Sequence, residues 1–139
     1  MRESDTFSAI QPNTIWPAMH ECTKAFHLVP GNAAIADKYA IVVGSSHAEP
    51  MLRSNTGEWK APKVHYNYLT HRDDVLAYWE ERVKERTSGE SLFTIGMRGI
   101  HDSPIIGPKT QKERIATVEQ IFYREACLAD HNIAAAHKN

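Results

Sequence analysis

Three short stretches of the sequence combine aromatic, basic and acidic side chains next to glycine or proline. They are residues 16–21 (WPAMHE), 44–53 (GSSHAEPMLR) and 96–102 (GMRGIHD). A tryptophan can stack on the apolar face of a sugar ring. An arginine can hold a carboxylate through two parallel hydrogen bonds, and an aspartate or glutamate can act as a general acid or base. Together these side chains favour a site for an anionic carbohydrate.

Each of these residues also has a structural interpretation that the sequence leaves open. Trp16 follows an apolar segment, so it fits the hydrophobic core as well as a ligand platform. His47 follows a buried apolar run and fits a turn in which its polar atoms are satisfied locally. Arg98 and Asp102 stand four residues apart around Gly99, a spacing that also suits a structural ion pair.

A metal site is a third interpretation of the same stretches. His20, Glu21, His47 and Glu49 carry side chains that can bind metal ions. However, no H-E-x-x-H or comparable spacing occurs, and the two cysteines of the chain have no metal-type spacing. We therefore expect neither a metal nor another cofactor.

The size of the chain limits the possible architectures. It has 139 residues, 42% of them hydrophobic, which is enough for one domain with a modest core. A complete (β/α)₈ barrel typically needs about 250 residues, so it is excluded as a self-contained structure. With 17 acidic and 16 basic residues the net charge is −1, which argues against electrostatic binding of nucleic acid or of an anionic membrane. The sequence contains no apolar run of transmembrane length, and its first residues lack the apolar stretch of a signal peptide.

Each polar stretch follows a short apolar segment that we predict to be a strand. These segments are residues 13–16, 41–43 and 92–95, and a proline or a glycine follows each one. Alternation of strands and helices predicts βα units and a parallel sheet. In such folds ligands bind at the carboxyl ends of the strands, where the three polar stretches lie. The sequence therefore predicts an α/β fold with one polar site at the strand ends.

Three helices are predicted around the strands. The first covers residues 32–39 with Asn32 as its cap, and the second is capped by Thr70. The third opens on a capping box, in which Thr110 and Glu113 satisfy each other's backbone N–H groups. The apolar stripes are Val75, Leu76, Trp79 and Val83 in the second helix, and Ile115, Val118, Ile121, Phe122 and Ala126 in the third.

The remaining segments divide the chain into a body and two ends. Residues 1–11 are a polar lead-in, residues 12–129 form the α/β body, and residues 130–139 are a polar tail that looks truncated. Residues 45–69 show little periodicity, and a loop of this length is usually functional or disordered. Three strands and about three helices give a thin structure, because a parallel sheet needs cover on both faces. The pattern therefore indicates part of a larger structure.

The motifs at the three strand ends resemble those of family 115 glycoside hydrolases, which are xylan α-1,2-glucuronidases. They are NTIWPAMHE at residues 13–21, GSSHAEPM at 44–51 and TIGMRGIHD at 94–102, and they occur in the same order as in the family. The resemblance runs from about Pro12 to about Leu128.

The resemblance implies a segment of a catalytic domain. The catalytic domain of the family is a (β/α)₈ barrel, a TIM-type fold, within a longer multidomain chain. This sequence would be a partial barrel of about three consecutive βα units with parallel strands. The implied activity is inverting hydrolysis that releases glucuronic acid, or its 4-O-methyl form, from xylan side chains. Because other site residues of the family come from strands outside this segment, the alternative is a non-catalytic, truncated fragment with at most weak sugar-acid binding.

The resemblance also implies a role for each candidate residue. Trp16 would form part of the sugar-binding wall, and His47 would contact the glucuronic acid. Asp102 would be one of the pocket carboxylates, and Arg98 would pair with a carboxylate of the sugar or of a neighbouring side chain. Asp102 and His47 are thus the expected catalytic residues. The expected substrate-binding residues are Trp16, Arg98, Glu49 and Arg53. Glu49 and Arg53 lie near the same loop, and their alternative role is to brace it.

The expected partners are glucuronoxylan and its oligosaccharides, with no nucleic acid and no membrane. The open edges of a partial sheet would allow a homo-oligomer. The sequence shows no signal peptide, and it leaves the cellular location open. A secreted or periplasmic parent enzyme fits a plant polysaccharide as the substrate.

Overall fold

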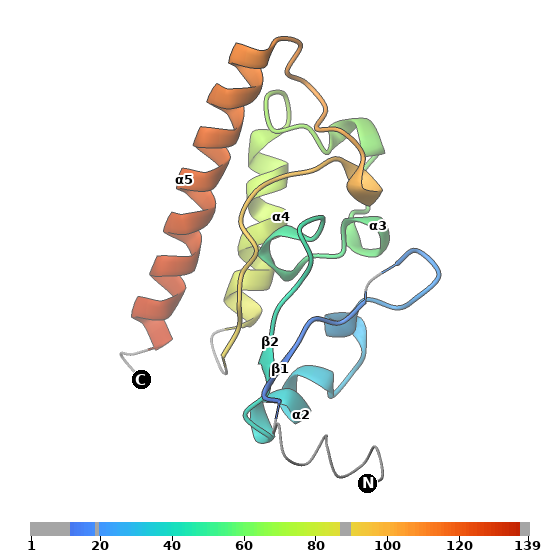
Figure 1. The fold of residues 1–139 in the computed structure, drawn as a ribbon, viewed down its shortest axis with the longest axis vertical. Coiled ribbons are helices and arrows are strands. Elements are labelled where there is room, and N and C mark those ends of the chain that lie inside the picture. The colour runs from blue at the N-terminus through green and yellow to red at the C-terminus, as the bar shows by residue number, and fades with distance from the viewer. Residues whose placement is uncertain (1–11, 19, 87–89, 137–139) are drawn as a thin grey trace, which may run out of the picture.

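The strands in the described residues form a small parallel sheet. The computed structural model describes residues 12–18, 20–86 and 90–136. Strand β1 (Thr14–Ile15) pairs in parallel with β2 (Val42–Val43), and Ile15 lies opposite Val43 (Figure 1). The predicted strands 13–16 and 41–43 are therefore confirmed in place and direction, although each is shorter than expected.

The third predicted strand, residues 92–95, is not formed. Ser91 makes a single parallel bridge to Val43. Thr94 then leaves the ladder: its carbonyl accepts a hydrogen bond from Met51 N–H at 2.9 Å, and its hydroxyl donates to the Ser45 carbonyl at 2.8 Å. The prediction is wrong because the backbone of this segment bonds to the loop after β2 instead of extending the sheet. Within the described residues the mixed α/β class is confirmed, but the partial barrel is not.

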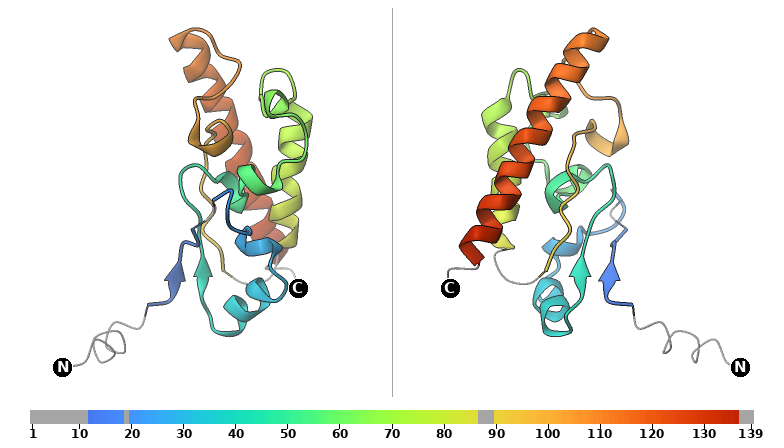
Figure 2. Two further views of the ribbon diagram at one scale, coloured as in Figure 1. Left: turned by 90° about the vertical axis from the view of Figure 1, so that its right-hand side faces the viewer. Right: turned by 60° about the vertical axis from the view of Figure 1, so that its left-hand side comes forward.

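Helices form the layer beside the strands. Helices α4 and α5 lie side by side, and α2 lies next to the two strands (Figures 1 and 2). The α-helices are α2 (Asn32–Lys38), α3 (Asn55–Glu58), α4 (Arg72–Glu85) and α5 (Gln111–Ala136), and the 3₁₀ turns are η1 (Phe26–Leu28), η2 (Pro50–Leu52), η3 (Lys63–His65) and η4 (Ile100–Asp102).

The helix starts follow the sequence signals to different degrees. The capping box of α5 is confirmed, because Glu113 N–H donates to the Thr110 hydroxyl at 3.2 Å and Thr110 N–H donates to the Glu113 carboxylate at 3.0 Å. Helix α2 is capped instead by Gly31, which adopts a left-handed φ of 89°. Asn32 is already helical, and its side chain donates to the Phe26 carbonyl at 3.2 Å. Helix α4 starts after His71, one residue later than predicted.

The hydrophobic core lies where α4 meets the segments before and after it. The apolar stripe of α4 is confirmed, with Val75, Trp79 and Val83 all buried. The stripe of α5 is confirmed only in part, because Ile121 is buried whereas Ile115 and Phe122 are 51% and 42% exposed. Helix α5 lies at the edge of the described structure (Figure 1), and part of its apolar stripe stays exposed.

Residues 45–69 are not a simple loop. They contain η2, α3 and η3, and they place Met51, Leu52, Tyr66 and Tyr68 in the buried interior. Helix α5 continues to Ala136, into the segment expected to be a polar tail, whereas residues 1–11 lie outside the described residues. Among the residues that the structure describes, no helix combines the length and the apolar character needed to cross a membrane.

Candidate active site

The side chain of Trp16 lies over the backbone at the end of the neighbouring strand. A Cβ atom at Gly44 would lie 2.3 Å from the Trp16 indole Nε1, so only glycine accommodates the ring at this position. Trp16 as a whole is 66% exposed. Trp16 is therefore not a core residue, and it keeps ring surface available to a ligand.

The Asp102 carboxylate joins two basic side chains from different loops. His47 Nε2 lies 3.2 Å from Asp102 Oδ2, and Arg98 Nε lies 2.9 Å from Asp102 Oδ1. The side chains of His47, Arg98 and Asp102 are 72%, 50% and 45% exposed, so a ligand from solvent can reach them. The Arg98–Asp102 ion pair considered from sequence is present, and His47 is added to it.

A tight turn directs the Asp102 carboxylate. His101 and Asp102 adopt left-handed φ angles of 55° and 60°, a region in which histidine and aspartate are enriched among non-glycine residues. Gly99 N–H donates to the Ser103 carbonyl at 2.7 Å and closes the turn. A Cβ at Gly99 would lie 2.3 Å from Ser103 Oγ, so the turn also requires glycine there.

Asn55, a buried residue of α3, holds the two loops together. Its Nδ2 donates to the carbonyls of Ala48 at 3.1 Å and Gly99 at 3.4 Å, and its Oδ1 accepts a hydrogen bond from His101 N–H at 3.1 Å. It thus connects the loop that carries His47 to the turn that carries Asp102. The sequence does not point to this residue, because a single asparagine within 45–69 carries no pattern that indicates such a role.

The first polar stretch reaches the same place. The rings of His20 and His101 meet edge to face, with centroids 5.2 Å apart. Together with the Trp16 contact to Gly44 and the His47 contact to Asp102, this brings all three polar stretches together. The chain therefore brings the three polar stretches into contact, two of them directly after β1 and β2.

Comparison with known proteins identifies the family. A sequence model described as glycosyl hydrolase family 115 matches residues 7–138. The chain belongs to glycosyl hydrolase family 115. Among solved structures, this family 115 segment is similar to a 4-O-methyl-α-glucuronidase of the family with specificity for decorated arabinogalactans, with a TM-score of 0.80 and 42% identity. The match covers 87% of this chain and 16% of that glucuronidase, and no curated protein matches the sequence.

In the family 115 segment, Glu49 lies beneath the His47 loop. Its carboxylate accepts hydrogen bonds from the Ser46 hydroxyl at 2.8 Å and from Ser46 N–H at 3.2 Å. The Ser45 hydroxyl donates to the Glu49 carbonyl at 2.7 Å. Glu49 is buried, so its visible contacts brace the turn that presents His47.

The structure places Arg53 away from the Asp102 cluster. Its guanidinium donates to the Tyr78 carbonyl at 2.7 Å and to the carboxylates of Glu58 and Glu81. Burial alone would lower the pKa of Arg53, but the hydrogen bonds to Glu58 and Glu81 outweigh it and raise that pKa. Arg53 therefore joins the loop after η2 to α4 within the family 115 fold.

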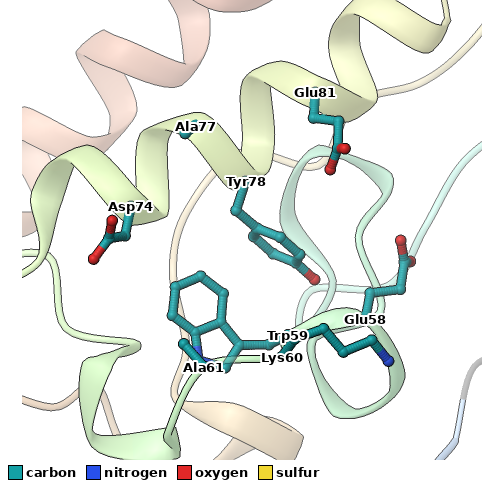
Figure 3. A pocket seen from close by; sticks show the side chains of 8 residues that line it. All are labelled: Glu58, Trp59, Lys60, Ala61, Asp74, Ala77, Tyr78 and Glu81. Atoms are coloured by element: carbon teal, nitrogen blue, oxygen red, sulfur yellow. The ribbon is translucent and has the colours of Figure 1, made fainter.

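A surface pocket of about 560 Å³ is lined in part by Glu58 and Glu81, the two acidic partners of Arg53 (Figure 3). Rings of Trp59 and Tyr78 meet edge to face in it, with centroids 5.2 Å apart. Carboxylates of Asp74 and Glu81 also line it. None of the predicted site residues lines this pocket, so it is not the candidate active site of this family 115 chain.

The described residues contain no group of three or more histidine, cysteine, aspartate or glutamate side chains that could hold a metal ion. Of the four side chains considered as ligands, His20 and His47 instead contact His101 and Asp102.

Proposed function

We propose that this chain is part of an inverting glycoside hydrolase that releases glucuronic acid, or its 4-O-methyl form, from the side chains of xylan. The observation that supports it most is the contact of His47 and Arg98 with the Asp102 carboxylate, where the three polar stretches meet. Membership of a glycoside hydrolase family supports glycoside hydrolysis as the chemistry that we assign to this cluster.

The exposed side chains suit a terminal uronic acid. Trp16 offers a ring face on which the apolar side of a pyranose can stack. Arg98 and His47 offer donors for the carboxylate of the sugar, because each has an exposed side chain beside Asp102. In this proposal, both basic side chains bind the uronic acid in a fixed orientation.

Asp102 supplies one carboxylate of the reaction. Inversion needs a general acid and a general base about 6.5–9.5 Å apart, with a water molecule between the base and the anomeric carbon. We propose that the second carboxylate comes from a part of the parent protein outside this segment, since the chain spans 16% of the length of the similar glucuronidase.

Two polysaccharides are candidate substrates. We propose glucuronoxylan, with decorated arabinogalactan as the second candidate, because the similar solved structure is described as specific for the latter. Both polymers are plant cell-wall materials, so an exported parent enzyme, secreted or periplasmic, completes the proposal. A non-catalytic segment with weak sugar-acid binding is the alternative, and the high exposure of the His47 side chain favours it.

Hydrolysis by the full-length parent protein tests the proposal. We expect release of glucuronic acid from decorated xylo-oligosaccharides, with the β-anomer formed first as inversion requires. D102N should lower kcat at least about 100-fold, since one carboxylate supplies a large part of acid–base catalysis. K84Q, on the exposed side of α4, is the matched control and should leave the rate unchanged. Full activity of D102N would remove Asp102 from the proposed mechanism.

The same assay separates the two polymers and the non-catalytic alternative. Faster release from arabinogalactan fragments than from xylan fragments would replace the first substrate by the second. No release from either polymer, combined with glucuronate binding that D102N or R98A abolishes, would support the non-catalytic alternative.

A further inference from the structure

The turn that carries Arg98 and Asp102 is held at both ends by buried polar side chains. Asn55 holds its far end through Gly99 and His101, as described above. At its near end, the Gly96 N–H donates a hydrogen bond to the Glu125 carboxyl group of α5. Glu125 is completely buried, which is unusual for a glutamate side chain.

Helix α5 packs closely against Gly96. The glycine has a left-handed φ of 124°, and a Cβ on it would lie 3.1 Å from Cε1 of the Phe122 ring. Phe122 and Glu125 are three residues apart, so they lie on the same side of the helix. A ring and a carboxyl group of α5 thus contact one glycine, two residues before Arg98.

The surroundings of Glu125 keep its carboxyl group neutral. Burial raises the pKa of Glu125 to about 9, and the hydrogen bond from Gly96 N–H lowers it by less. The second oxygen, Oε1, has no hydrogen-bond partner among the described residues. Burial, and more weakly the charge of Glu125, also raises the pKa of Tyr66.

We propose that Glu125 is a positioning residue that fixes the start of the 96–102 turn to α5 and thereby sets the geometry of the Arg98–Asp102 pair. Its contribution is the acceptor oxygen offered to Gly96 N–H, so an uncharged acceptor of the same shape can replace it. Glu125 contacts neither Arg98 nor Asp102 in the described hydrogen bonds, and it acts through the backbone between them. The assignment rests on the proposed function of that pair.

The matched variants are E125Q and E125M, which both remove the ionisable group. E125Q keeps an acceptor oxygen, whereas E125M keeps the size and removes the acceptor. By NMR on this chain, E125M should speed hydrogen exchange of the Gly96 amide at least about tenfold and shift the Arg98 Nε–H resonance. E125Q should restore both to values close to those of the wild type.

Two further variants separate positioning from loss of stability. E125D shortens the side chain by one methylene and should reproduce the E125M effect even if E125M does not fold. V83A removes core volume on α4 and should lower stability without moving the Arg98 resonance. An unchanged Arg98 resonance in both E125M and E125D, or an equal disturbance by E125Q, would overturn the proposal.

Kinetics of the parent protein separate this proposal from the proposed function. E125M should reduce kcat/KM at least about tenfold, and E125Q should stay within about twofold of the wild type. If the parent and its D102N variant are equally active, the proposed role of Asp102 fails, while the NMR result still decides whether Glu125 positions the turn. If D102N is inactive and E125M is fully active, the positioning role alone fails.

Discussion

His47 and Asp102 are 55 positions apart in the sequence, yet His47 Nε2 lies 3.2 Å from Asp102 Oδ2. Arg98 engages the other oxygen of the same carboxylate, so both oxygens point in defined directions. Exposed ion pairs of this kind contribute only about 0–1 kcal/mol to stability. The value of the cluster therefore lies in the placement of three reactive side chains, which several substitutions can test.

Replacing His47 should separate binding from stability. We expect H47A to weaken binding of glucuronate-bearing xylo-oligosaccharides about tenfold, because one hydrogen-bonding group at the candidate site is lost. The free energy of unfolding should change by less than about 1 kcal/mol, since the side chain is 72% exposed. Calorimetric titration of the parent protein and urea unfolding measure the two effects. A large loss of stability with unchanged binding would make His47 a structural residue.

Substitution of Gly44 should displace Trp16. In G44A the new methyl group would occupy a position 2.3 Å from the Trp16 indole Nε1, so the ring has to move away from the strand end. Acrylamide quenching of tryptophan fluorescence should increase and substrate binding should fall. The control is G57A, where the added Cβ meets only Ser54 Oγ at an ordinary 3.8 Å. Identical quenching in G44A and the wild type would contradict the contact.

Glu58 should be far more important for stability than its neighbour Glu81. The buried Glu58 carboxylate accepts hydrogen bonds from Arg53 and Arg82, and the side chains of all three are almost fully buried. E58Q leaves two buried guanidinium groups without this counter-charge, which should cost about 3–5 kcal/mol in urea unfolding. E81Q, at a carboxylate that is 67% exposed, should cost less than about 1 kcal/mol. Equal losses would mean that the network is not the source of the stability.

The protein should lose stability as the pH rises, because of Glu125. Its pKa is raised from 4.5 to about 9 in the folded state, so the unfolded chain releases a proton that the folded chain keeps. The stabilisation is fully present below pH 4.5 and is lost as the pH rises to about 9, with a slope near 1.4 kcal/mol per pH unit. E125Q should flatten this decline in urea unfolding series between pH 5 and 9. A decline that persists in E125Q would assign it to another group.

His27 should have the opposite effect at acidic pH. Burial first, and then the charges of Arg82, Arg86 and Arg53, lower the pKa of His27 from 6.5 to about 3. Its contribution to stability is present above pH 6.5 and is lost as the pH falls toward 3, since only the unfolded chain binds the proton over that range. H27Q should therefore lose less stability than the wild type between pH 6.5 and 4. An unchanged acid profile would exclude His27.

Local sequence patterns predicted the local features of this fold. The capping box of Thr110 and Glu113 and the buried stripe around Trp79 are confirmed, because each depends on residues within one or two helical turns. The parallel pairing of β1 and β2 is confirmed as well. The first two polar stretches follow β1 and β2, so their meeting was predictable because the carboxyl ends of parallel strands share one edge of the sheet. The third stretch joins them although no strand directly precedes it in the described residues.

The features that the sequence did not predict depend on distant partners. Thr94 bonds to the loop after β2 instead of extending a strand, a choice that no pattern within residues 92–95 encodes. Asn55 meets His101 across 46 positions, and Glu125 meets Gly96 across 29. Both are polar residues whose burial follows only from the packing around them. The roles of the site residues themselves remain predictions.

The left-handed backbone at His101 and Asp102 also concerns the evolution of this site. Each such residue stores roughly 1–3 kcal/mol of strain that a glycine would relieve. A glycine at position 101 would also loosen the Asp102 carboxylate that faces His47, and a glycine at position 102 would remove it. Selection for stability and selection for the site therefore act in opposite directions. The side chain at position 101 can change without loss of that carboxylate. The residues that relatives carry at this position would therefore show which of the two pressures prevails.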